Sequence, residues 1–112
     1  MEQDQELEEK WEKLREELAG QFGKKPDLNG VLFLVGIREL GAGTRKFTKE
    51  QKVDLMHIAV CRLLSDSGYY RLAGKDKDGW PHWEQLKKLP FINVIQQENY
   101  LKFHIIEYFE HL

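Results

Sequence analysis

A strongly apolar stretch at residues 47–67, FTKEQKVDLMHIAVCRLLSDS, places the tightest limit on how this chain can fold. Thr48 is a preferred N-cap residue and Gln51 stands three positions later, which is the spacing of a capping box. From Val53 to Leu64 most side chains are apolar, and they cover far more than one stripe of a helix. Such a helix has to be surrounded by other elements. The pattern therefore predicts a central helix over residues 48–66, with the rest of the chain packed around it.

Residues 4–22 carry one narrow apolar stripe at helical spacing between acidic and basic residues. The stripe consists of Leu7, Trp11, Leu14, Leu18 and Phe22. A helix with so thin a stripe docks on its own domain or pairs with a second chain, and two heptads are too few for a coiled coil to stand alone. Docking is favoured, with a helix-mediated homodimer as the alternative. Because Gly20 to Pro26 predicts a flexible linker, we divide the chain into an acidic amphipathic helix and linker at 1–24 and a helical domain with a β-hairpin insertion at 25–112.

Residues 27–40, DLNGVLFLVGIREL, suit either a buried strand or a buried helix. Apolar positions continue at helical spacing to Leu40, and Asp27 can cap the first turn. The helix is therefore favoured, with Gly36 allowing a neighbouring element to approach closely.

The C-terminal residues predict one more buried helix, capped by Asn93, after a short helical turn at 83–89 that Pro90 ends. Its expected apolar face is Leu101, Ile105 and Tyr108, widened by Tyr100, Phe103, His104, Ile106 and Phe109.

Residues 69–83, YYRLAGKDKDGWPHW, predict a hairpin, because Asp78-Gly79 is a favoured pair for a two-residue turn with positive φ at both positions. Pro81 restricts the second strand to an edge. Five ring-bearing residues make this hairpin a candidate partner-binding surface: Tyr69, Tyr70, Trp80, His82 and Trp83. The alternative is a lid over the helices, since two strands alone are marginally stable in water. The fold class is thus mainly α, a small helical bundle of three to four helices with one short β-hairpin.

Two other groups of residues could carry chemistry. A glycine-rich turn at 41–46 leads into the capped helix and has four basic residues in or near it: Arg45, Lys46, Lys49 and Lys52. Free amides at a helix start together with basic side chains can hold a phosphate. The alternative is a plain helix connection with solvated lysines.

Asp54, His57 and Cys61 share one helical face, so His57 and Cys61 are weak candidates for a metal or a thiolate site. In so apolar a helix, a structural role for both side chains is favoured. No metal and no cofactor are assigned.

A single cysteine, Cys61, cannot form an internal disulfide, and the acidic start of the chain is unlike a secretory signal. We therefore expect a cytoplasmic protein without a membrane segment. Aromatic excess without catalytic groups favours a non-enzymatic protein-interaction domain, self-association included. Nucleic-acid or phosphate binding through the basic residues is the less favoured alternative, because residues 21–112 carry fourteen Lys and Arg against eleven Asp and Glu, a weak excess of positive charge.

The run from Pro26 to Phe109 resembles a family of small uncharacterised bacterial proteins. The resemblance lies in FLVGIRELG, KFTKEQKVDLMHIAVCRLL, GYY, DGWPHW, KKLP and IIEYF. It implies no activity and no catalytic residues, and it leaves the acidic N-terminal helix outside.

Overall fold

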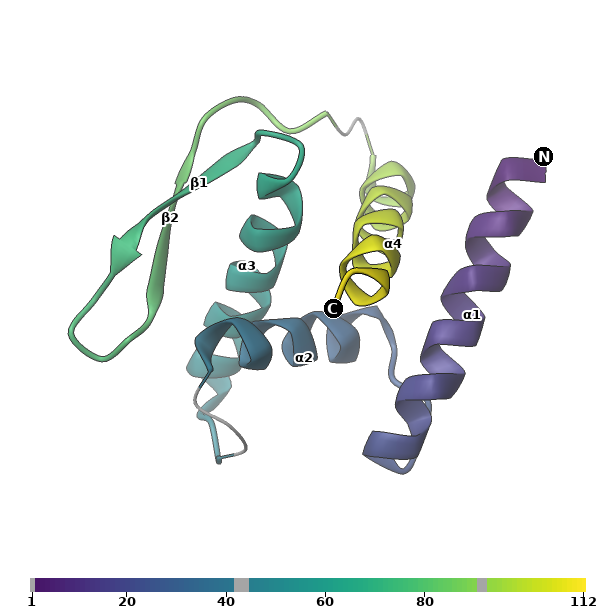
Figure 1. Ribbon diagram of the computed structural model, residues 1–112, viewed down its shortest axis with the longest axis horizontal. Helices are drawn as coiled ribbons and strands as arrows, with labels where there is room; N and C mark the ends of the chain where they lie inside the picture. Colours follow the sequence, from purple (N-terminus) through teal and green to yellow (C-terminus); the bar gives the residue numbers. More distant parts are fainter. Residues whose placement is uncertain (1, 42–44, 91–92) are drawn as a thin grey trace. The chain divides into compact units, whose positions relative to one another are not determined.

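The computed structural model describes residues 2–41, 45–90 and 93–112, without the side chains of residues 2–4 and 22. The elements are α1 (Glu2–Phe22), α2 (Leu28–Leu40), α3 (Lys49–Ser65), β1 (Tyr70–Lys75), β2 (Pro81–Gln85) and α4 (Val94–Glu110) (Figure 1). The described residues thus form four helices and one hairpin, which confirms the mainly α fold class.

The chain divides into two compact units, Met1–Val31 with Phe91–Leu112, and Leu32–Pro90. The first boundary falls inside α2, after its first turn. The predicted separation of residues 1–24 from 25–112 concerns independent folding and stays a prediction.

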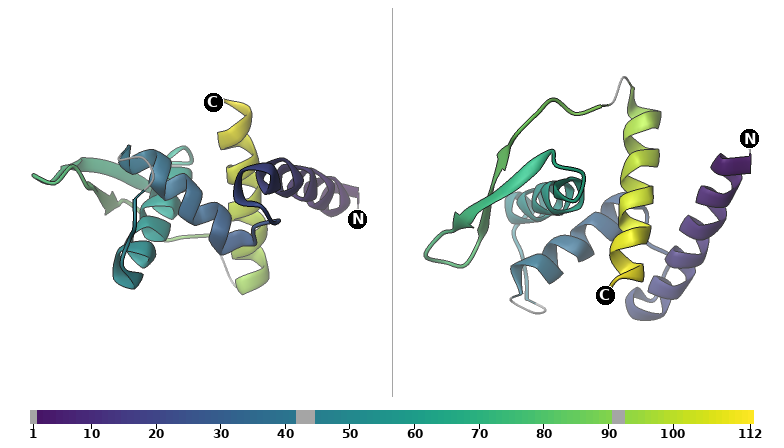
Figure 2. Two further views of the ribbon diagram at one scale, coloured as in Figure 1. Left: turned by 90° about the horizontal axis from the view of Figure 1, so that it is seen from below. Right: turned by 45° about the horizontal axis from the view of Figure 1, so that its top comes forward.

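In the first unit, α1 lies beside α4 (Figures 1 and 2). The side chains of Trp11, Leu14 and Leu18 are buried, with Trp11 only 3% exposed. Lys102 of α4 lies with its Nζ 2.9 Å from the Glu8 carboxylate and 5.7 Å from the centre of the Trp11 ring. The apolar stripe of α1 therefore docks within its own chain, as favoured from the sequence; the Phe22 side chain lies outside the described part.

The predicted linker is shorter than expected, because its first residues belong to α1. Gly20 belongs to α1, which continues to Phe22. Further on, the Pro26 carbonyl accepts a hydrogen bond of 2.6 Å from Arg15 Nε, and Lys25 Nζ lies 2.5 Å from the Glu12 carboxylate. Two side chains of α1 thus hold the connection to α2, a long-range effect that glycine and proline content does not reveal.

Helix α4 begins as predicted, because the Asn93 side chain accepts a hydrogen bond from the Gln96 amide at 2.9 Å. Its buried residues are Leu101, His104, Ile105, Ile106 and Tyr108. His104 Nδ1 lies 2.9 Å from the Tyr100 carbonyl, which gives this buried imidazole a backbone partner. Phe103 departs from the prediction, since it remains 50% exposed and lines a hollow between α4 and the first half of α1.

In the second unit, residues 32–40 continue α2 as a helix, so the helical alternative for this segment is correct. A Cβ atom added at Gly36 would overlap the Leu55 carbonyl oxygen, so only glycine permits this approach of α2 to α3. Helix α3 has the predicted capping box, with Thr48 Oγ1 accepting from the Gln51 amide at 3.1 Å and Gln51 Oε1 accepting from the Thr48 amide at 2.9 Å. Local sequence therefore fixes where α3 starts.

Strands β1 and β2 pair antiparallel, with Leu72 opposite Trp83 and a register shift between Leu72 and Gly74. The predicted turn type is wrong: Gly79 has a φ of 86°, but no described residue other than glycine has a positive φ. The Gly79 amide donates to the Asp76 carbonyl and the Asp76 amide to the Trp80 carbonyl, both at 3.0 Å, as in a three-residue hairpin loop.

Residues 83–89 also differ from the prediction, because 81–85 form β2 and 86–89 contain no helix. The leucine spacing of this segment suits a helical turn, but pairing with β1 supplies its backbone with hydrogen bonds instead. The Leu86 amide extends the hairpin by donating to the Tyr69 carbonyl at 2.8 Å.

Candidate functional site

A pocket of about 300 Å³ lies between the turn end of the hairpin and the first half of α3, within the second unit. Its lining residues are Asp54, His57 and Ile58 from α3, and Asp76, Trp80, Pro81 and His82 from the hairpin. Ile58 and Pro81 are buried, whereas both carboxylates and both imidazoles are exposed. The pocket therefore combines an apolar base with titratable groups at its opening.

Hairpin residue Asp76 organises one side of this pocket. Its Oδ1 accepts hydrogen bonds from the Asp78 and Trp80 amides at 3.0 Å each, and His82 Nε2 lies 3.1 Å from Oδ2. The Trp80 amide and the His82 side chain hold the pKa of this carboxyl below its usual value. Asp76 is therefore charged at neutral pH and positions Trp80 and His82 beside one another.

Three residues of α3 form the opposite side, because positions three and four apart share a helical face. Ile58 contributes the apolar part, while His57 and Asp54 are exposed residues of the lining. Across the described ranges, the Asp54 carboxylate has neither a hydrogen bond nor an ion pair. It is thus an unneutralised charge at the edge of a hollow that already contains Asp76.

The candidate thiol site has a different character. Cys61 Sγ lies 3.5 Å from His57 Nε2, as the helical spacing suggests. Cys61 is fully buried, and burial raises the pKa of its thiol from 9.0 to about 11. Because the thiolate is the reactive form, this sulfur is a poor nucleophile at neutral pH. No cluster of three or more His, Cys, Asp or Glu side chains suitable for a metal ion occurs in the described part of the chain.

The five ring-bearing residues of the hairpin separate into different environments. Tyr70 is buried beside α3, which is the lid role. Tyr69 is half-buried with Lys87 Nζ 4.5 Å from its ring centre, and Trp83 is half-buried. Trp80 is also half-buried, but it lines the pocket, and His82 is exposed. The hairpin is therefore a lid at one end and an accessible surface at the other.

The basic residues at the start of α3 do not form one enclosed site in the described part. Arg45 lies over the Phe47 ring at 5.0 Å, while Lys46, Lys49 and Lys52 are exposed. The capping box already uses the Gln51 amide, which a bound anion would otherwise accept from. Residues 42–44 of the predicted glycine-rich turn lie outside the described residues, so anion binding here stays a prediction.

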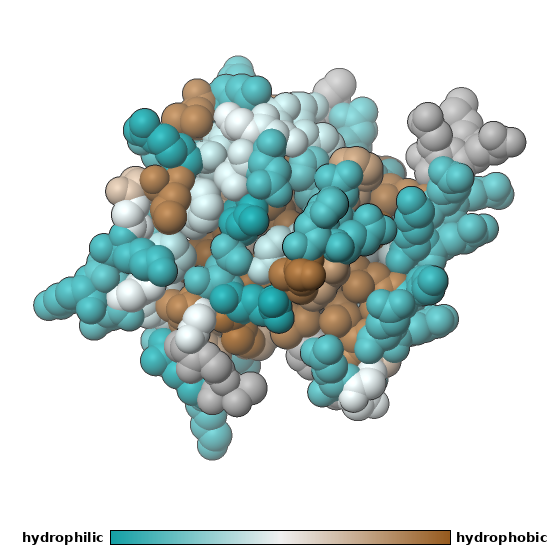
Figure 3. Space-filling model, viewed as in Figure 1, coloured by the Kyte–Doolittle hydropathy of each residue, from teal (hydrophilic) through white to brown (hydrophobic). Residues whose placement is uncertain are grey.

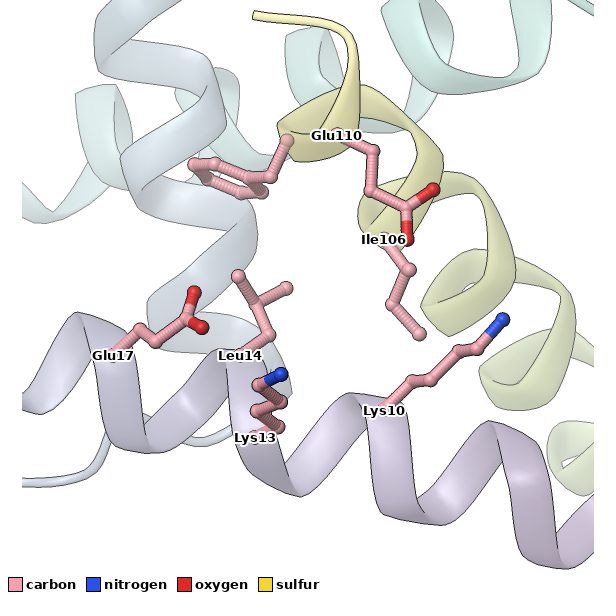
Figure 4. A pocket seen from close by; sticks show the side chains of 7 residues that line it. Lys10, Lys13, Leu14, Glu17, Ile106 and Glu110 are labelled. Carbon is pink, nitrogen blue, oxygen red and sulfur yellow. The ribbon is translucent and has the colours of Figure 1, made fainter.

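A second hollow, of about 350 Å³, lies in the first unit between α1 and α4 (Figure 4). Lys10, Lys13 and Glu17 surround it from α1, and Ile106 and Glu110 from α4. The charges of both signs in this lining favour no single ligand class. The hairpin pocket is the stronger candidate because, within the described residues, its lining has two carboxylates, two imidazoles and an indole, but no lysine or arginine.

The sequence identified some but not all members of this pocket. His57, Trp80 and His82 were candidates for separate reasons, and the fold brings them together. The sequence presents Asp54 only as a helical neighbour of His57, and it assigns no site role to Asp76. The one local signal for Asp76 is that aspartate at the start of a turn often accepts from amides two residues on.

Comparisons with known proteins add nothing to the local geometry. No protein-family model matches the chain, and no curated protein and no solved structure matches it significantly. Over the residues that the structure describes, no helix has both the length and the apolar character needed to cross a bilayer.

Proposed function

We propose that this protein is a non-enzymatic, cytoplasmic protein-interaction domain whose contact surface is formed by the hairpin and the adjoining side of α3. The observation that carries the proposal is the apolar exposure around this surface. Val53 is 55% exposed, Leu72 47% and Leu86 50%. In Figure 3, hydrophobic groups (brown) lie among hydrophilic ones (teal) over the hairpin, at the left of the view. Hydrophobic groups rimmed by polar ones are typical of contact surfaces.

A binding role fits the chemistry of the neighbouring groups better than a catalytic one. The buried Cys61 thiol has a raised pKa, so it is not activated. Both oxygens of the Asp76 carboxylate already have hydrogen-bond partners in the hairpin loop and at His82. These groups shape the surface, and a partner would bury Leu72 and the accessible part of Trp80.

Site-specific photo-crosslinking tests the proposal directly. A photoreactive phenylalanine analogue placed at Leu72 is expected to capture a protein in cells of the natural source. The same group at Lys49, on the exposed first turn of α3, serves as the matched position. A discrete protein adduct at position 72 that is absent from position 49 supports the interaction surface.

The same pair of positions tests the nucleic-acid alternative. If Lys49 rather than Leu72 yields an adduct, and nuclease removes it, the basic residues form the functional surface and our proposal fails. Binding of that kind would also weaken steeply with salt, because each phosphate contact releases counterions.

A further inference from the structure

We propose that the pocket between the hairpin turn and α3 receives a single lysine or arginine side chain of the protein partner. The inference rests on the proposed interaction function and specifies what the partner must present. The charge, the apolar lining and the size of the pocket support it.

Two carboxylates line the pocket. Asp54 and Asp76 approach the pocket from opposite sides, one from α3 and one from the hairpin loop. Asp76 already has three hydrogen-bond donors, whereas Asp54 has no partner among the residues described. The other titratable groups of the lining are the imidazoles of His57 and His82, of which His82 already pairs with Asp76, and no described lysine or arginine lines the pocket. A cation would pair with Asp54 and be attracted by Asp76, while both carboxylates would repel an anion. The pocket thus selects positive charge.

The apolar lining narrows the choice among cations. Ile58 and Pro81 are buried in the pocket and Trp80 contributes an indole. An aliphatic stem packs against such groups while its charged end stays near water, and an ammonium or guanidinium group is attracted to an indole face. A bare metal ion would gain nothing from these residues. A long basic side chain uses both kinds of lining.

Size supports one side chain rather than a whole organic ligand. At about 300 Å³ and open to solvent, the pocket is at the lower limit of the roughly 300–1,000 Å³ that small-molecule sites occupy. Exposed apolar side chains elsewhere on the same unit, Val53 and Leu72 among them, would then contact the rest of the partner. The basic side chain would act as an anchor within a larger interface.

Nuclear magnetic resonance titration of the full chain provides the test. The probes are N-acetyl-lysine methylamide and N-acetyl-arginine methylamide, with N-acetyl-norleucine methylamide as the uncharged match of the lysine probe. We expect the indole N–H signal of Trp80 to shift saturably with the cationic probes and not with the norleucine probe. An equal response to norleucine overturns the inference.

Two carboxylate variants make the test specific. Asp54→Asn should weaken binding of the cationic probes about five-fold. This is the change in affinity that corresponds to the attraction between two unit charges about 4 Å apart in water. Asp78→Asn removes the same charge from the hairpin turn at a residue that does not line the pocket, so it should change affinity less than two-fold or so. Equal effects of the two substitutions would show a diffuse electrostatic attraction and would overturn the pocket assignment.

The outcome for the pocket is separable from that for the proposed function. If the Leu72 adduct still forms while no cationic probe binds, the interaction surface stands and the cation pocket is rejected. If the probes bind in the expected pattern but no adduct forms, the ligand preference stands and the interaction function is rejected.

Discussion

The α1–α4 pair and the hairpin–α3 layer both place tryptophan beside a helix, but they use it differently. Trp11 is 3% exposed in the first, whereas Trp80 and Trp83 are only half-buried in the second. A long helix can bury several residues of an apolar stripe along a neighbour, as Trp11, Leu14 and Leu18 show, but a two-stranded ribbon offers too little area to bury all its aromatics. Burial within α1–α4 leaves that stripe unavailable, while the hairpin retains surface for a partner.

Charges follow the same contrast. In the first unit, Lys102 joins Glu8 across two helices. In the second, Arg71 pairs with Glu84 within the hairpin, and Asp76 serves its own loop. Asp54 is left without a partner in the described part of the chain. The hairpin layer therefore keeps both apolar and charged groups that its own fold does not use.

The largest effect is expected where burial is most complete. Trp11→Ala should lower the free energy of unfolding by about 3–5 kcal/mol, because it removes a buried aromatic and leaves a cavity. Urea unfolding followed by circular dichroism measures the change, and Trp11→Phe, which keeps a ring, should cost less. A loss below about 1 kcal/mol for Trp11→Ala would contradict the contrast between the two regions.

The next largest effect on stability is expected at the close approach of α2 to α3, within the second unit. Gly36→Ala should destabilise by about 1–3 kcal/mol, because the new Cβ meets the backbone of Leu55, which cannot rotate away. Gly20→Ala in α1 is the matched control, since nothing lies within 4 Å of its Cβ position. It should instead stabilise by roughly 0.5–1 kcal/mol, as alanine favours a helix. Thermal unfolding of both variants should move in opposite directions.

The first residues of α3 and α4 could be predicted from sequence, because an N-cap depends on residues a few positions apart. Thr48 with Gln51 and Asn93 with Gln96 are the two examples. The pocket could not be predicted. Asp54 and Asp76 are far apart in sequence, and only the pairing and turn of the hairpin bring them together. The exposure of Phe103 was also not predicted. The sequence of a helix does not show how much of its surface a neighbouring element covers.

The two hairpin tryptophans should separate the lid role from the contact role. Trp83 lies opposite Leu72, and its buried indole N–H has no acceptor among the described residues. We expect Trp83→Ala to cost about 1–3 kcal/mol of stability through lost packing, and Trp80→Ala less than about 1 kcal/mol. Trp83→Phe should be nearly neutral, since it also removes an unpaired donor. Chemical denaturation decides, and equal losses for both alanine variants would make the whole hairpin a lid.

The reactivity of the Cys61 thiol shows whether water and reagents reach the buried side of α3. We compare it with the buried stripe of α1 against α4. The thiol pKa of about 11 predicts slow reaction with a disulfide reagent at pH 8 until the chain unfolds. Since the pKa is raised in the folded state, the unfolded chain loses this proton first, and stability should fall as pH rises from about 9 to about 11. A Cys61→Ala variant should lose less stability over this pH range, and the part that remains includes the Tyr70 phenol, whose pKa burial also raises. Rapid labelling of the native protein would show that the layer opens.

The smallest effect is expected for the ion pair between α1 and α4. The Glu8 side chain is 51% exposed and that of Lys102 is 16% exposed, so water screens their attraction. A double-mutant cycle with Glu8→Gln and Lys102→Met should give a coupling energy of about 0.2–1 kcal/mol that shrinks at high salt. Lys102→Met alone should keep the packing of its stem against Trp11. A coupling above about 2 kcal/mol would mean that charge, rather than the buried stripe, holds α1 in place.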